Sequence, residues 1–240
     1  MKVHGLLVPT LVTLLGLAVL ISLGTWQMQR LAWKQGLIDR IESRSEAPPV
    51  ALEKALSAWR ETGDVEYLRV ELDGEFRHEG EQHLYGIVGG RPGWRVVTPL
   101  RTPSGLWVMV DRGFVPFDFK EAETRAGGQI NGPVRLIGLA RAPGAANSFT
   151  PQNEPDQNKW YARDLDAMAA RALPREDRDR VAPFFVEAEA MELPGGLPRG
   201  STTRLNLPNR HFEYAVTWYL LAVVLLVIYG INVRNWLRRD

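Results

Sequence analysis

Two uncharged apolar runs set the architecture of this chain: LLVPTLVTLLGLAVLISL at residues 6–23 and YAVTWYLLAVVLLVIYGI at residues 214–231. A helix needs about 20 predominantly apolar residues to cross the ~30 Å hydrocarbon core of a bilayer, and each run reaches that length with its flanking residues. Because backbone groups inside a bilayer must be hydrogen-bonded within the segment, both runs are predicted to be helices. We place transmembrane helices at residues 6–24 and 211–231.

A cleavable signal peptide is an alternative for the first run, because Ser22 and Gly24 resemble a small-x-small cleavage site. The run is longer than the roughly 7–15 apolar residues typical of a signal peptide, and Lys2 is the only Lys or Arg before it. A mitochondrial presequence needs an Arg- and Ser-rich amphipathic segment, for which the preceding residues leave no room. We therefore expect an uncleaved anchor in a bacterial protein.

Basic side chains in the two short tails predict the orientation in the membrane. They are Lys2, Arg234, Arg238 and Arg239. Since Lys and Arg are enriched on the cytoplasmic side, residues 1–5 and 232–240 are predicted to be cytoplasmic tails. Residues 25–210 then form a periplasmic domain, and the protein is a two-pass component of the inner membrane.

The composition excludes several classes of protein. The chain has 240 residues and a formal net charge of +1, so it lacks the positive charge expected of a nucleic-acid-binding protein. With no Cys, it has no disulfide framework, no Cys-ligated zinc or iron–sulfur site and no thiol redox chemistry.

The first helix is expected to continue beyond the membrane. Trp26, Arg30, Trp33, Leu37 and Ile41 recur at helical spacing on one stripe. The helix is predicted to reach about residue 42 and to end before the Pro-Pro pair at residues 48–49.

Short alternating strands separated by Gly and Pro dominate the rest of the extramembrane domain. The predicted strands are 67–76, 83–88, 94–100, 106–110, 134–140 and 184–188, with an extended segment at 159–162, short helices at 50–59 and 163–172, and a turn at 89–93. The fold class is therefore a membrane-anchored α+β protein. Two terminal transmembrane helices flank a mostly antiparallel, barrel- or sandwich-like β domain with short helices.

Enzyme signatures are absent from the sequence, which has no G-x-S-x-G, Walker loop, H-E-x-x-H or C-x-x-C motif. His78 and His83 lie five residues apart with no third ligand in view, whereas structural zinc takes four ligands. We expect these histidines to be exposed, and we expect the protein not to be an enzyme.

His211 is the one histidine in an informative position, where the second transmembrane helix begins. Asn209 is placed to cap that helix, and His211, Tyr214, Ala215 and Trp218 follow at i, i+3, i+4 and i+7, on one face. Interfacial aromatic residues are common in any membrane protein, so this face has a purely structural interpretation. The functional interpretation is an imidazole that faces a protein partner or ligates haem iron.

Five residues besides His211 fit a haem at that depth. Tyr214, Trp218 and Trp26 would suit a flat apolar macrocycle, and Arg30 and Arg210 would meet its propionates. The predicted cofactor-binding residues are His211, Tyr214, Trp218, Trp26, Arg30 and Arg210, with His211 as the iron ligand.

Short motifs along the chain are similar to those of a known protein family. They include Gly-Thr-Trp-Gln at 24–27, Thr-Pro-Leu at 98–100, Arg-Gly-Phe-Val-Pro at 112–116, Leu-Ile-Gly at 136–138 and Thr-Trp-Tyr at 217–219. These motifs resemble the Surfeit-locus cytochrome oxidase assembly family in the order in which they occur and in the share of the chain that they cover, between two terminal transmembrane segments. Asp111 stands where that family's pattern has Asn before the Arg-Gly.

The resemblance implies a non-enzymatic assembly factor for haem–copper (cytochrome c) oxidase. It implies transient binding of haem a, with His211 at the position of the candidate ligand and no structural cofactor. The partners implied are the catalytic subunit I of the oxidase, haem a synthase and the membrane, with no nucleic acid. The alternative is a cofactor-free membrane scaffold that stabilises an oxidase assembly intermediate, in which His211, Tyr214 and Trp218 only pack against other helices.

Overall fold

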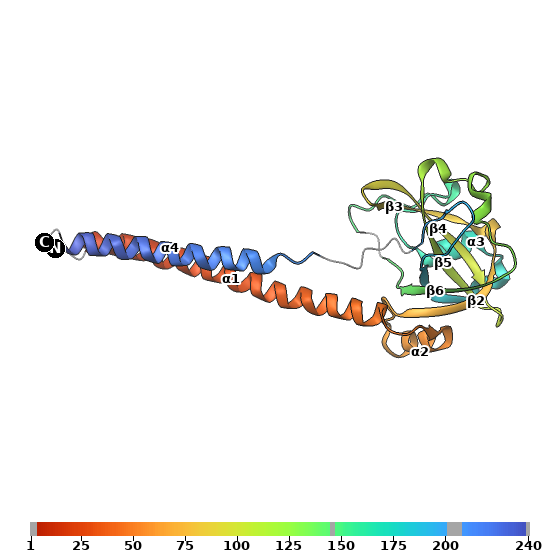
Figure 1. The fold of residues 1–240 in the computed structure, drawn as a ribbon, viewed down its shortest axis with the longest axis horizontal. Helices are drawn as coiled ribbons and strands as arrows, with labels where there is room; N and C mark the ends of the chain where they lie inside the picture. The colour runs from red at the N-terminus through yellow and green to blue at the C-terminus, as the bar shows by residue number, and fades with distance from the viewer. Residues whose placement is uncertain (1–3, 145–146, 201–207, 239–240) are drawn as a thin grey trace. The chain divides into compact units, whose positions relative to one another are not determined.

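The computed structural model describes residues 4–144, 147–200 and 208–238 (Figure 1). Lys2 and Arg239, on which the predicted orientation partly rests, lie outside them. The chain divides into two compact units. One consists of Met1–Ile41 with Leu205–Asp240, and the other, the β domain, consists of Glu42–Arg204.

The first unit is built from α4 (His211–Leu237) and from α1 (His4–Ser45) as far as Ile41. Both are long and apolar enough to cross a membrane, as the sequence predicts. Large apolar side chains along them are exposed in the chain itself, Leu15 by 70%, as expected of surfaces that face lipid. The predicted continuation of the first helix is confirmed, since α1 runs without a break to Ser45.

Small residues let α1 and α4 approach closely. A Cβ atom at Gly24 would lie 2.7 Å from the Tyr219 ring, and one at Gly16 would lie 3.0 Å from Leu225. Polar side chains also connect the helices, because the Thr10 hydroxyl lies 2.5 Å from that of Tyr229. Small residues and interhelical hydrogen bonds are the usual means of helix association in membranes, so α1 and α4 form a specific pair.

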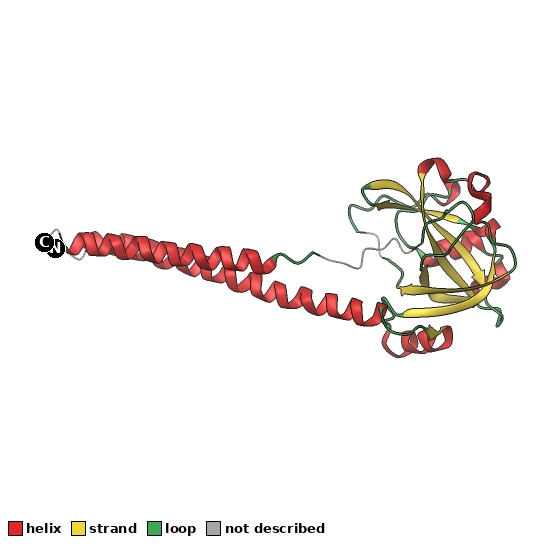
Figure 2. Ribbon diagram, viewed as in Figure 1, coloured by secondary structure: helices red, strands yellow, loops and turns green. Residues whose placement is uncertain are grey.

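A single seven-stranded sheet forms the centre of the β domain (Figure 2). Its strands are β1 (Val50–Ala51), β2 (Arg69–Phe76), β3 (Gln82–Val88), β4 (Arg91–Arg101), β5 (Trp107–Pro116), β6 (Pro133–Arg141) and β7 (Val181–Ala188). The spatial order is β1-β2-β6-β7-β5-β4-β3, with an additional short pairing between β2 and β4. Most neighbours are antiparallel, but β1–β2 and β5–β7 are parallel, so the sheet is mixed.

The helices of the β domain are short. They are α2 (Leu52–Thr62), α3 (Leu165–Ala172) and the 3-10 helices η1 (His78–Gly80), η2 (Phe117–Phe119), η3 (Ala122–Gly128), η4 (Pro155–Gln157) and η5 (Arg175–Arg180). The α+β class with two apolar terminal helices is confirmed, and the barrel- or sandwich-like closure stays a prediction.

Two apolar clusters bury opposite faces of the central strands. Successive side chains of β5 alternate between them: Val108 and Val110 join the cluster that contains α2, whereas Trp107 and Met109 join the cluster that contains α3. A strand covered on both faces reads as a continuous apolar run rather than as an alternating one.

The strand boundaries correct three predictions. β1 lies where the sequence predicted the start of a helix, because Val50 and Ala51 pair with β2 before α2 begins. The turn predicted at 89–93 contains only Gly89 and Gly90, whose φ angles of 59° and 79° fit a two-residue hairpin. β5 continues to Pro116, beyond the predicted end at residue 110.

Candidate functional site

His211 is the first residue of α4, and its imidazole is half-buried. Its Nδ1 lies 2.7 Å from Oε1 of Gln27 on α1. An amide oxygen only accepts hydrogen bonds, so in this contact the imidazole donates from Nδ1. Nε2 then keeps its lone pair, and it has no hydrogen-bond partner among the described residues. A half-buried imidazole with a free Nε2 lone pair is able to ligate a metal.

The predicted cap of this helix is wrong. Arg210, with φ −101° and ψ 10°, is the N-cap residue, and it makes no side-chain capping hydrogen bond. Asn209 lies one residue too early to cap, because the first helical residue is His211. Its side-chain amide is buried, with no hydrogen-bond partner within the described part of the chain.

The other predicted site residues divide into two groups. Trp218 is half-buried on the same side of α4 as Ala215, which is only 1% exposed. Tyr214 and Trp26 are 55% and 53% exposed, so they lie at the edge of the helix pair rather than inside it.

The two predicted arginines are exposed. The Arg30 guanidinium lies 3.9 Å from the centroid of the Trp33 ring, a cation–π contact between neighbours on α1. Arg210 is exposed at the N-cap position of α4.

Gln27 and Lys34 are site residues that the sequence did not predict. Gln27 contacts His211 directly, and the Lys34 ammonium donates to the backbone carbonyl of Pro208 at 2.6 Å. Both are polar residues near the boundary of an apolar helix, and Gln27 lies in the 24–27 motif. A polar side chain at such a place is itself a signal of function.

The histidines of the β domain, His78 and His83, make contacts within that domain. His78 Nε2 lies 2.7 Å from the Ile130 carbonyl. His83 is 5% exposed and His78 is half-buried, so the predicted exposure of both is wrong. The His83 ring contacts Glu81 and Asn158. No group of three His, Cys, Asp or Glu side chains in the described residues could hold a metal ion.

Glu81 is the centre of a buried ionic cluster. Arg125 donates to both carboxylate oxygens and to the carbonyls of Phe119 and Lys120. Burial acts to raise the pKa of Glu81, but hydrogen bonds from His83 and Arg125 outweigh it and lower that pKa to about 2. Glu81 is therefore a charged structural residue at neutral pH and is unsuited to proton transfer.

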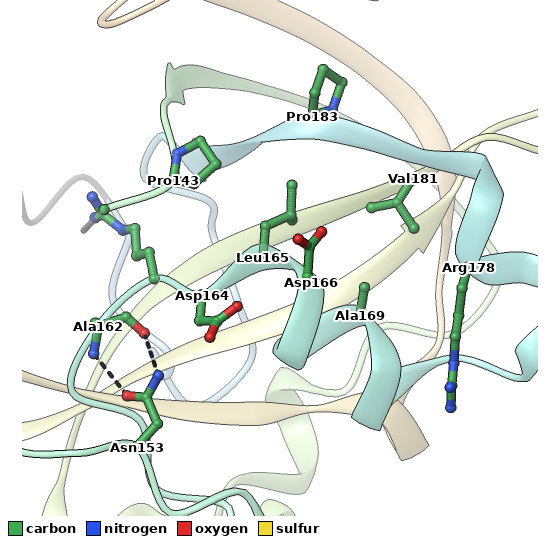
Figure 3. A pocket seen from close by; sticks show the side chains of 12 residues that line it. Pro143, Asn153, Ala162, Asp164, Leu165, Asp166, Ala169, Arg178, Val181 and Pro183 are labelled. Carbon is green, nitrogen blue, oxygen red and sulfur yellow. Dashed lines mark hydrogen bonds between the residues drawn. The ribbon is translucent and has the colours of Figure 1, made fainter. Parts of the chain in front are cut away.

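A cavity of about 830 Å³ in the β domain lies beside α3 (Figure 3). Asn153 bonds the backbone of Ala162 with both of its amide atoms, and Asp164 caps α3 by accepting from the Ala167 N–H. The cavity is lined by Arg163 and Arg178 as well as by Asp164 and Asp166, so neither positive nor negative charge dominates the lining. These polar groups serve local structure, and the start of α4 remains the strongest candidate site.

A pair of apolar helices able to span a membrane and one β-rich domain define a membrane-anchored protein of two units. The model of the SURF1 family matches residues 14–223, a range that includes every predicted site residue. The chain belongs to the SURF1 family.

Relatives from distant animals match over most of their length. Surfeit locus protein 1 of Homo sapiens is 38% identical over 218 residues, which cover 84% of this chain and 69% of the human protein. The Takifugu rubripes protein of the same name is 33% identical and covers 84% and 87%. A SURF1-like protein of Caenorhabditis briggsae is 30% identical and covers 91% and 73%.

Proposed function

We propose that this chain is an assembly factor for cytochrome c oxidase, anchored in the membrane by α1 and α4. Membership of the SURF1 family implies oxidase assembly, and the two apolar helices support a two-pass membrane protein. The β domain serves as the docking surface for the oxidase catalytic subunit I and for haem a synthase. The protein is not itself an enzyme.

We further propose that the chain holds haem a, as cargo for the oxidase, where α4 begins. The observation that carries this proposal is the imidazole of His211, whose Nδ1 is bonded to Gln27 and whose Nε2 is free. Haem iron takes an imidazole nitrogen as an axial ligand. A histidine that ligates a metal through one nitrogen typically donates from the other to a carbonyl or carboxylate oxygen, which is the role of Gln27 Oε1 here.

The side chains around His211 fit a flat, amphipathic molecule. Tyr214 and Trp26 offer exposed aromatic surface, and Trp218 lies half-buried one turn further into the membrane. Arg210 and Arg30 are the cations available to the two propionates. A single protein ligand gives modest affinity, which suits a molecule that has to be passed on.

Haem content tests the proposal directly. The native chain and His211→Ala are purified after co-expression with the enzymes of haem a synthesis, and bound haem is measured by the pyridine haemochrome spectrum. We expect about one haem a per native chain and a loss or spectral change in His211→Ala. Phe212→Ala is the matched control, because Phe212 is the next residue on α4 and is 57% exposed.

Two results would contradict this assignment. A native chain without haem would favour the cofactor-free scaffold. Equal amounts of haem with equal spectra in the native and His211→Ala chains would show that haem binds without His211 as its ligand. Circular dichroism and membrane insertion of each variant control for folding.

A further inference from the structure

Two polar side chains of α1 hold the start of α4. Gln27 and Lys34 lie seven residues apart, which places them on one face of α1 at a separation of about 10 Å. Gln27 bonds the His211 ring at 2.7 Å, and Lys34 bonds the Pro208 carbonyl at 2.6 Å. The short segment 208–211, at which α4 begins, is therefore hydrogen-bonded to α1 at both of its ends.

The helix pair brings Gln27 within reach of the imidazole. Gly24, one turn before Gln27, lets the Tyr219 ring lie against the α1 backbone. The Thr25 hydroxyl adds a contact of 3.3 Å with the Tyr219 hydroxyl. Among the described residues, Gln27 is the side chain that hydrogen-bonds the His211 ring, and it therefore orients the imidazole.

A neutral imidazole carries its proton on either Nδ1 or Nε2, and only the unprotonated nitrogen can ligate a metal. The acceptor at Nδ1 favours the form with the proton there and the lone pair on Nε2. We propose that Gln27 is a positioning residue that fixes this form of His211 and so selects Nε2 as the ligating atom. The inference rests on the proposed function for its purpose, but the hydrogen bond itself is testable without haem.

The acceptor at Nδ1 is a neutral amide rather than a carboxylate, and this affects how strongly the imidazole binds iron. A carboxylate at Nδ1 would draw the proton more strongly, make the imidazole a stronger donor to iron and add a charge near the membrane. A neutral amide orients the ring and leaves it a weaker ligand. This combination suits a site that releases what it binds.

The first experiment uses the haem-free chain. Histidine labelled with ¹⁵N is incorporated into the full chain in lipid nanodiscs, and the His211 signals are assigned by their absence in His211→Ala. We expect the Nδ1-protonated form in the native chain and a mixture of both forms in Gln27→Leu. Gln35→Leu is the matched control, because Gln35 lies on the same helix and its side chain bonds the exposed Asp39, at 3.0 Å, rather than the His211 ring.

The second experiment measures the chain loaded with haem a. We expect Gln27→Leu to weaken haem binding roughly 10- to 100-fold, the range seen when such a partner of a metal-ligating histidine is removed. Gln27→Leu should lower the iron–histidine stretching frequency and raise the midpoint potential, because the imidazole becomes a weaker donor to iron. Gln27→Glu should change both in the opposite direction, whereas Gln35→Leu should change neither. A merely structural Gln27 would not produce opposite effects in the two variants.

The two experiments separate the inference from the proposed function. An Nε2-protonated His211 in the native chain, or the same form in native and Gln27→Leu chains, overturns the inference even if haem binds. The expected forms without any haem binding would instead overturn the haem proposal and leave the Gln27 hydrogen bond established.

Discussion

The buried carboxylate of Glu81 makes the β domain sensitive to acid. Its pKa is lowered from the ordinary 4.5 to about 2, because hydrogen bonds from His83 and Arg125 outweigh burial. A lowered carboxyl pKa stabilises the folded state above the unfolded pKa, and this contribution is lost as the pH falls from about 4.5 towards 2. The stabilisation at neutral pH is on the order of 3 kcal/mol.

We therefore expect Arg125→Gln to destabilise the β domain by about 3–5 kcal/mol at pH 7, because it leaves a buried carboxylate without its main partner. The loss of stability should be smaller at pH 3, because protonation of Glu81 removes its uncompensated charge. Urea unfolding followed by Trp fluorescence measures both values. Arg135→Gln is the control, since Arg135 is 68% exposed and pairs with Glu71 at the surface, where little change is expected. An equal loss at both pH values would contradict the assignment to Glu81.

Buried charge also explains where residue-level prediction failed. The polar pair at 111–112 signalled the end of a strand after Val110, yet both residues are buried inside β5. Asp111, where the family's pattern has Asn, forms an ion pair with Arg95 at 2.5 Å. Arg112 is the extra residue of a bulge, because Val96 pairs with Gly113 and Val97 pairs with Asp111. Partners distant in the sequence make such burial possible, and local periodicity does not reveal them.

At the scale of single elements, the close approach of α1 and α4 depends on Gly24. A larger side chain there meets the Tyr219 ring, which lies 2.7 Å from the position of a Cβ. We expect Gly24→Leu to move the helices apart and to separate Gln27 from His211. Gly36→Leu is the matched control on the same helix, because within the described part of the chain a Cβ built there meets no atom of another element within 4 Å.

Cross-linking measures this separation. The chain has no Cys, so Gln27→Cys with His211→Cys creates a unique pair for a short bifunctional thiol reagent. We expect high yield in this background and in the one with Gly36→Leu, and several-fold lower yield with Gly24→Leu. Equal yields in all three backgrounds would show that the helix pair does not need a small residue at position 24.

Element-level prediction succeeded where one pattern dominated. The apolar runs predicted α1 and α4, and alternation located β2, β3, β4, β6 and β7 close to their observed bounds. It missed β1, which has only two residues and exists through its pairing with β2. The candidate site was located by His211, whereas Gln27 was missed because its contact crosses between helices 184 residues apart in the chain.

At the scale of the whole molecule, the division into a helix pair and a β domain follows from the sequence, because apolar residues are concentrated at the two ends. The strand order β1-β2-β6-β7-β5-β4-β3 does not follow from it. The parallel contact of β5 with β7 joins strands separated by β6 and α3, and the choice of such partners depends on the complete core.

The orientation in the membrane is the last property that the sequence predicts and experiment can decide. The positive tails predict cytoplasmic termini and a periplasmic β domain. Because the chain has no Cys, single substitutions give unambiguous probes. Phe149→Cys marks the β domain at a side chain that is 95% exposed, and Arg238→Cys marks the end of α4.

A membrane-impermeant maleimide is added to intact spheroplasts and to lysed ones. We expect Phe149→Cys to be labelled in both and Arg238→Cys only after lysis, because the reagent does not cross the inner membrane. The opposite pattern would place the β domain in the cytoplasm and His211 at the inner boundary. Labelling of both positions before lysis would show that α1 and α4 do not span as a pair, and the haem site would then lack the membrane boundary on which its proposed geometry depends.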